Sequence, residues 1–414
     1  MIAPFAILLL SIALLPFVNA SWWHRHYAKV AVGLGALTVT YYLVALQSGL
    51  RILHVAHEYL SFIALIGSLF VVSGGIHIRV KGEAKPWMNC VFLLIGSLLA
   101  NFIGTTGASM LLIRPWIRMN RYRITGFHIV FFIFLVSNVG GCLTPIGDPP
   151  LFLGYLKGIP FWWTVQKCWP AWLLAVTCLL AVFYLFDQSN YLRAPQKIRE
   201  METAHETWRF EGLTNLAFLA VILAAVIIES PLGLREILML AAAAGSYFAT
   251  PKTVHEANDF ALEPIREVAW LFLGIFFTMI PALDYFEVHA SELGMDSPLK
   301  FFWATGILSA VLDNAPTYLT ILAAAMGRNH LSLNDATQVS QFGIEHGAEL
   351  LAISLGAVFF GAMTYIGNGP NFMVKAIAQR AKVHTPGFFA YLVQYALPIL
   401  IPIFVLVALV FFRE

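Results

Sequence analysis

Two aspartates in apolar surroundings are the residues of this chain best suited to chemistry. Asp148 ends the string SNVGGCLTPIGD, and Asp313 lies in ILSAVLDNAPTYLT. A carboxyl group within a membrane segment costs several kcal/mol unless it is protonated or paired, so it is a functional candidate by default. A structural ion pair is the alternative, but Lys375 is the nearest base beyond these strings. Such a carboxyl group can hold a proton near neutral pH and exchange it for Na⁺.

The aspartates belong to a set of four polar interruptions. NFIGTTGASM and LDNAPTYLT interrupt the apolar stretches 87–113 and 300–326, which predicts two re-entrant hairpins. SNVGGCLTPIGDPP and GAMTYIGNGPN interrupt the overlong stretches 124–155 and 343–378, which predicts two discontinuous helices. Unwound backbone at membrane depth is tolerated only where it lines a cavity or a ligand site. Its carbonyl groups and the hydroxyl, amide and carboxylate oxygens beside it suit Na⁺.

We therefore expect two facing sites near the membrane midplane, each built from one hairpin tip and one helix break. The expected cation- and proton-binding residues are Asp148, Asp313, Asn138, Thr144, Asn314, Thr317, Asn368 and Asn371. The other candidates at the hairpin tips and breaks are Asn101, Thr105, Thr106, Ser109, Gly140, Gly141, Pro145, Gly147, Pro316, Thr364, Gly367 and Gly369.

The composition indicates the environment of these elements. Of 414 residues, 59% are hydrophobic and 12% are charged, which is about half the charge of a soluble domain. A polytopic membrane protein is the class that fits, and a nucleic-acid binder is excluded. We find no zinc spacing, phosphate loop or nucleophile elbow, so the sequence supports neither enzymatic turnover nor ATP-driven transport, and we expect no cofactor besides Na⁺ and H⁺ as transported or coupling ions.

The order of the apolar segments repeats. Residues 1–186 and 210–414 contain the same series of spans, hairpin and broken helix, joined by the polar linker 187–209, and Thr144–Asp148 aligns with Thr364–Asn368. Each half crosses five times, so the second half enters from the opposite side, which predicts an all-α fold with an inverted-topology repeat. The predicted spans are 3–20, 28–47, 58–78, 124–155, 161–186, 210–229, 232–250, 266–284, 343–378 and 387–412.

Basic residues predict the orientation. Loops 21–29, 79–86, 114–123, 187–209, 250–266 and 375–384 contain 18 of the 25 Lys and Arg residues, so we assign their side to the cytoplasm. Both termini are then outside. We expect a multi-pass protein of the bacterial inner membrane whose first apolar stretch is retained as a span.

The four interruptions, together with LFLGYLKGIPF after the first break, resemble the ion transporter superfamily over nearly the whole chain. This group contains NhaD-type sodium/proton antiporters, CitMHS-like citrate carriers and arsenite carriers. The resemblance implies the architecture of divalent-anion/sodium symporters, which are homodimers whose hairpin-bearing domain moves as an elevator. Those symporters have Ser-Asn-Thr at their hairpin tips, whereas this chain has Gly104-Thr105-Thr106 and Asp313-Asn314-Ala315.

The charge of the site distinguishes the candidate substrates. A carboxylate close to a bound anion repels it, so Asp148 and Asp313 favour a cation, and sodium/proton antiport is the leading hypothesis. The alternative is a carrier of citrate or a related carboxylate, in which the acids hold the coupling Na⁺ or H⁺ and neutral Thr and Asn groups hold the substrate. An uncoupled channel is a third reading, which the inverted repeat disfavours.

Overall fold

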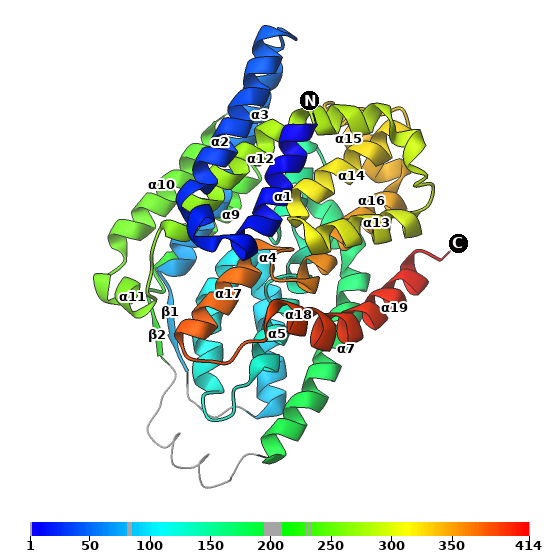
Figure 1. Ribbon diagram of the computed structural model, residues 1–414. Coiled ribbons are helices and arrows are strands. Elements are labelled where there is room, and N and C mark those ends of the chain that lie inside the picture. Colours follow the sequence, from blue (N-terminus) through cyan, green and yellow to red (C-terminus); the bar gives the residue numbers. More distant parts are fainter. Residues whose placement is uncertain (1, 81–84, 194–208, 229, 232, 414) are drawn as a thin grey trace.

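The computed structural model describes residues 2–80, 85–193, 209–228, 230–231 and 233–413, and these residues are almost entirely helical (Figure 1). The predicted all-α class is confirmed. One addition is a short antiparallel pair of strands, β1 (His77–Arg79) and β2 (Arg209–Glu211), in which Ile78 pairs with Phe210. The pair joins the end of the third helix to the start of the second half. Residues 194–208 of the predicted linker lie outside the described residues.

The first half runs from α1 to α7. Its apolar stretches become helices because they are long and uninterrupted, and Pro residues begin several of them, where the missing N–H costs nothing. The predicted loop 21–29 is wrong, since these residues lie within α2. The elements are α1 (Ala3–Val18), α2 (Ala20–Val44), α3 (Gly49–Gly74), α4 (Pro86–Met119), α5 (Gly126–Leu135), η1 (Val139–Leu143), α6 (Pro149–Lys157) and α7 (Phe161–Arg193).

The second half contains the helices from α9 onward. Short helices that the sequence did not predict are α11, at the start of the predicted loop 250–266, and α15, before the predicted span 343–378. The elements are α9 (Asn215–Val226), α10 (Leu234–Ala249), α11 (Lys252–Ala257), α12 (Glu263–Val288), η2 (Ala290–Leu293), α13 (Pro298–Val311), α14 (Asn314–Arg328), α15 (Ala336–Glu345), α16 (Gly347–Phe360), η3 (Gly361–Met363), α17 (Gly369–Arg380), α18 (Phe388–Tyr391), η4 (Leu392–Leu400) and α19 (Ile401–Phe411).

The described residues include seven helices that are long and apolar enough to cross a membrane, or eight if the pair Ala336–Glu345 and Gly347–Met363, bent by 99°, counts as one span. The protein is thus a multi-pass membrane protein, as predicted. The count is smaller than the ten predicted spans, in part because Ala3–Pro16 and Asn215–Val226 are shorter apolar helices.

Residues 86–119 form a helical hairpin rather than one straight helix. Its backbone turns at Gly104, where φ is 73° and ψ is 155°. Asn89 Nδ2 donates a hydrogen bond of 2.8 Å to Asn120 Oδ1. The ring centroids of Phe92 and Trp116 are 5.4 Å apart. In a straight helix residues 89 and 120 would be separated by about 46 Å. Helices α13 and α14 likewise pack together about a turn at Asp313.

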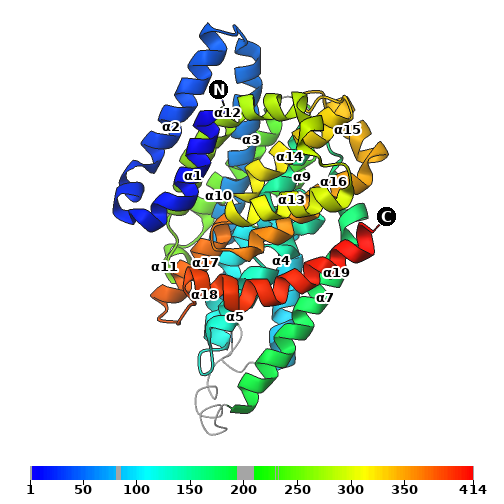
Figure 2. The same ribbon diagram turned by 45° about the vertical axis from the view of Figure 1, so that its right-hand side comes forward.

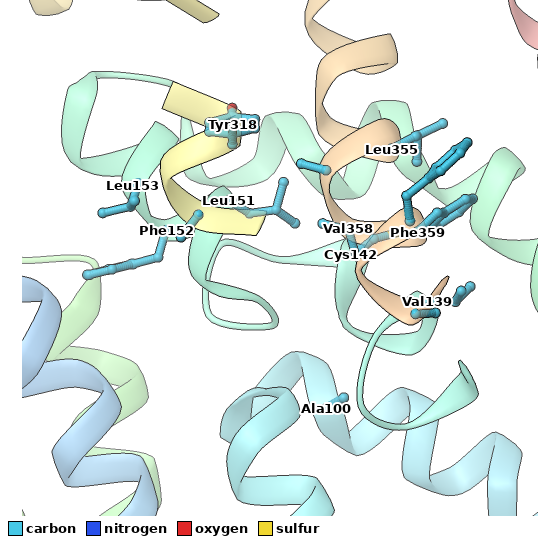
Figure 3. Packing of buried hydrophobic residues seen from close by; sticks show 14 of the residues in the cluster. Ala100, Val139, Cys142, Leu151, Phe152, Leu153, Tyr318, Leu355, Val358 and Phe359 are labelled. Carbon is cyan, nitrogen blue, oxygen red and sulfur yellow. The ribbon is translucent and has the colours of Figure 1, made fainter. Parts of the chain in front are cut away.

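The helices fall into two groups (Figure 2). The α2–α12 group consists of α1, α2, α3, α9, α10 and α12, and α2 crosses α12 closely where Gly35 meets Gly274. The hairpin group consists of α4 to α7 and α13 to α19. Within it, the two halves interleave: α6 packs on α14, and η1 packs on α16. Figure 3 shows this packing, with Phe152 of α6 on the side of Tyr318 and Cys142 near Val358. This core surrounds the polar interruptions.

Candidate functional site

The carboxylate of Asp148 is the point at which all four polar interruptions meet. Asp148 precedes α6 and is 1% exposed. It accepts hydrogen bonds from Thr105 Oγ1 at 2.7 Å and from Asn314 Nδ2 at 2.6 Å, which belong to the two hairpin tips. A third comes from Asn368 Nδ2 of the second helix break, at 2.9 Å. Each of the other three interruptions therefore contributes one donor to a single acid.

Local sequence explains why the chain is not helical before α6. Pro149 and Pro150 lack N–H groups, which suits the first turn of α6 but ends any preceding helix. Gly147 packs directly on the carbonyl oxygen of Gly141, which a β-carbon at Gly147 would approach to 2.0 Å. The carbonyl group of Gly147 accepts a hydrogen bond of 2.7 Å from the backbone N–H of Thr105. The break is thereby fastened to the tip of the first hairpin.

The second half repeats this attachment at the positions that the sequence alignment pairs. Asn314 N–H donates to the carbonyl group of Gly367 at 3.2 Å, as Thr105 does to Gly147. The hydroxyl group of Thr364 donates to the carbonyl oxygen of Ala310 at 2.7 Å. Thr144 makes the corresponding bond to Asn101 at 2.6 Å. Each helix break is therefore bound to its own hairpin by the same pair of contacts.

Amide side chains connect the two breaks behind Asp148. Asn138 donates to Asn371 Oδ1 at 2.7 Å and accepts from Asn368 Nδ2 at 3.2 Å. Asn371 Nδ2 in turn donates to the carbonyl groups of Gly361 and Thr364. All three asparagines are buried. Unwound backbone carbonyl groups thus find donors within the site, as buried polar groups must.

Asn314 has one polar atom that this network leaves unused. Its Nδ2 binds Asp148, but its Oδ1 is buried and accepts no hydrogen bond from the described part of the chain. An unpaired buried acceptor is costly. Because the atom belongs to a residue that contacts the Asp148 carboxylate, it is a natural ligand for a cation held there.

Asp313 occupies a different position from Asp148. Its Oδ1 caps α14 by accepting a hydrogen bond of 3.0 Å from the N–H of Ala315, and its carbonyl oxygen accepts from Thr317. Its side chain is partly exposed, whereas Pro316 is buried in the first turn of α14. The structure thus has one centre at Asp148 with Asp313 on its margin, in place of the two equivalent facing sites that we expected.

The remaining predicted residues are divided between the centre and its supports. Asn101 binds the break through the carbonyl oxygen of Gly140 at 2.7 Å and the N–H of Leu143 at 2.8 Å. Ser109 and Ser137 share a hydrogen bond of 2.7 Å. Pro145 is buried beside them in the chain, while Gly369 begins α17 and is exposed. These residues shape the centre without touching Asp148 through the bonds described.

A hollow of about 330 Å³ opens beside Asp148, between the first hairpin tip and α3. Thr105, Thr106 and Asp148 give it a polar wall, and Leu65, Ile66 and Leu69 of α3 face them. The α3 residues carry no polar signal, so sequence reasoning could not assign them to a site. The lining contains one carboxyl group and no Lys, Arg or His. Its charge therefore suits a cation and opposes an anion.

Comparisons with known proteins agree with a transport role. Residues 1–412 match the family described as "Putative citrate transport". Two proteins named as uncharacterized transporters, from Mycobacterium bovis and Mycobacterium tuberculosis, are each 24% identical to the chain over 322 residues. These matches cover 73% of this chain and 71% of each relative.

Proposed function

The chain belongs to the citrate transport family, and from that premise we propose that it is a secondary active transporter that exchanges Na⁺ for H⁺ at Asp148. One observation carries the proposal: three hydrogen-bond donors from separate polar interruptions meet a single buried carboxylate beside a hollow that has no basic residue. A lone acid in such a position binds either a proton or a metal cation.

Competition for this acid is sufficient for antiport. Burial disfavours the charged carboxylate, whereas the bonds from Thr105, Asn314 and Asn368 favour it, so neither the protonated nor the ionised form dominates by a wide margin. An arriving Na⁺ displaces the proton and gains the carboxylate together with neighbouring oxygens. Asn314 Oδ1 and Thr105 Oγ1 are the neutral ligands nearest to hand. Asp313 adds negative charge at the margin.

An elevator mechanism accounts best for movement of the ion. The matched bonds Thr105–Gly147 and Asn314–Gly367 support an inverted repeat with two discontinuous helices. In the mechanism that we propose, the hairpin group carries the ion past the α2–α12 group, which stays fixed. We further propose a homodimer in the bacterial inner membrane with both termini outside the cytoplasm, in line with the distribution of Lys and Arg.

Transport of citrate or a related carboxylate with Na⁺ or H⁺ is the second candidate, and the family description favours it. In that case Asp148 holds the coupling ion. The hydroxyl groups of Thr105 and Thr106, which line the hollow, then bind the substrate. The absence of a basic residue from that lining ranks this candidate below cation antiport.

Na⁺-driven proton movement in vesicles of purified protein tests the proposal. We expect Asp148→Asn to abolish exchange, because the amide can release no proton. Asp313→Asn keeps a good helix cap but removes the charge, so we expect exchange with weaker Na⁺ dependence. Asp296→Asn is a matched control, because Asp296 is an exposed partner of Lys300. Normal exchange by Asp148→Asn refutes the proposal, and Na⁺-dependent uptake of labelled citrate identifies the second candidate.

A further inference from the structure

A second hollow, separate from the Asp148 centre, has the opposite charge. It encloses about 590 Å³ between the end of the first hairpin, the end of α17 and the loop that follows α11. Arg114, Arg118 and Arg380 line it together with one acid, Asp259. Three positive charges and one negative charge leave an excess of two positive charges. The remaining lining is apolar.

Neither Arg114 nor Arg380 is fully used by the surrounding protein. Within the residues that the structure describes, each has Asp259 as its single polar partner, at 3.7 Å and 3.6 Å. These distances are too long for good hydrogen bonds, and one carboxylate is shared by both groups. A guanidinium group has five N–H donors in a planar fork. Both groups therefore retain donors for an additional oxygen-bearing ligand.

Helix ends alone do not explain this cluster. Basic residues are common in the last turn of a helix because they offset its dipole, and this accounts for Arg118 and Arg380 separately. Arg114 lies further inside its helix, and its side chain is 25% exposed. It also lines a smaller hollow between α3 and α4 with Ser73 and Met110. That hollow lies along the same two helices as the hollow at Asp148, with residues 70–74 following residues 65–69 in α3.

We propose that the hollow at Arg114 and Arg380 binds a small multivalent anion through carboxylate or phosphate oxygens. Guanidinium forks match the paired oxygens of such groups. The three loops that meet there, 114–123, 250–266 and 375–384, are all assigned to the cytoplasm by their basic residues, so the ligand comes from that side. The site is distinct from the cation centre and is needed by neither candidate function.

Binding to the purified full-length protein tests the site, with citrate and inorganic phosphate as probes in neutral detergent and with vesicles containing an anionic lipid as a third probe. We expect binding to weaken about tenfold for Arg114→Gln or Arg380→Gln, which corresponds to about 1.4 kcal/mol for each arginine. Arg114→Lys restores part of the affinity, since it restores the charge but not the fork. Arg209→Gln is the control, because Arg209 is an exposed arginine that also has one acid, Glu211, at 3.8 Å.

The outcomes are distinguishable. Loss of citrate or phosphate binding in Arg114→Gln and Arg380→Gln, but not in Arg209→Gln, supports a site for a soluble anion. The same pattern with anionic vesicles alone assigns the site to a lipid headgroup. Equal binding of every probe by wild type and Arg380→Gln overturns the proposal, and because Arg380 is largely exposed this variant is expected to fold. Asp148→Asn should keep anion binding, which separates this test from that of cation exchange.

Discussion

Asn314 donates a hydrogen bond of 2.6 Å to Asp148 across 166 residues of sequence. This contact joins the tip of the second hairpin to the break in the first half, so the cation centre belongs to neither half alone. We expect Asn314→Ala to weaken the apparent Na⁺ affinity about tenfold, because Asp148 loses a donor and the ion loses an oxygen ligand. The Na⁺ dependence of exchange at fixed pH measures this effect.

Asn329→Ala provides the control for Asn314→Ala. Asn329 ends the same helix, α14, and donates to the carbonyl oxygen of Ala325 at 3.0 Å. Its removal should leave the Na⁺ dependence unchanged. If both variants have the Na⁺ dependence of wild type, Asn314 takes no part in ion binding.

The pH dependence of Na⁺ binding follows from competition for one carboxyl group. As the pH falls, protons occupy Asp148 and the apparent Na⁺ affinity decreases, by about tenfold per pH unit once the protonated form prevails. As the pH rises, the affinity levels off at its intrinsic value. Calorimetric titration of Na⁺ at a series of pH values measures the slope, and Asp148→Asn should remove it. A flat profile in wild type is incompatible with competition.

Glu58 and Lys157 form a buried ion pair of 2.7 Å between α3 and the end of α6. It joins the α2–α12 group to the hairpin group. Glu58→Gln leaves Lys157 buried without its counter-ion, so we expect a loss of stability of about 3–5 kcal/mol. Glu58→Met combined with Lys157→Met should recover most of it. Thermal unfolding in detergent, analysed as a double-mutant cycle, measures the coupling.

His54 offers a mild comparison for this pair. Its Nε2 lies 3.0 Å from Glu58, but its side chain is 60% exposed. His54→Gln should therefore cost no more than about 1 kcal/mol. A loss as large as that of Glu58→Gln would mean that the Glu58–Lys157 contact is not the dominant one.

Gly147 is the position where a single added carbon should do the most damage to the centre. A β-carbon there would lie 2.0 Å from the carbonyl oxygen of Gly141, so Gly147→Ala must displace the break and the Thr105 contact. We expect loss of exchange together with a lower unfolding temperature. Gly33→Ala is the control, because Gly33 lies in α2 with no atom within 4 Å of the added carbon. Helix propensity makes that change neutral or stabilising by up to about 1 kcal/mol.

The sequence predicted the turns and breaks well because their causes are local. The turn at Gly104 and the end of helix before Pro149 depend on conformations that neighbouring residues dictate. By contrast, the contact between Asn314 and Asp148 depends on how the halves pack. Pseudo-symmetry suggested two sites, yet the aligned residues Asp148 and Asn368 differ in charge and bind each other across one centre.

Other differences have equally physical reasons. Residues 21–29 are polar enough to suggest a loop, but Asn19 caps α2 by accepting a hydrogen bond from the N–H of Trp22, and the helix starts there. The hollow at Arg114 was not foreseen because its arginines lie in separate loops and were counted only for topology. Spacing along the chain reveals which residues interrupt a helix, whereas tertiary contacts determine which of them meet.

Helix α6 has consequences beyond its length of nine residues. Asp148 stands at one end and Lys157 at the other, about 13 Å away along a stiff rod. A shift of the loaded end cannot be absorbed within so short a rod, so it must tug on the clasp that Lys157 makes with Glu58. Loading the ion and loosening the grip on the stationary helices are then two ends of one lever.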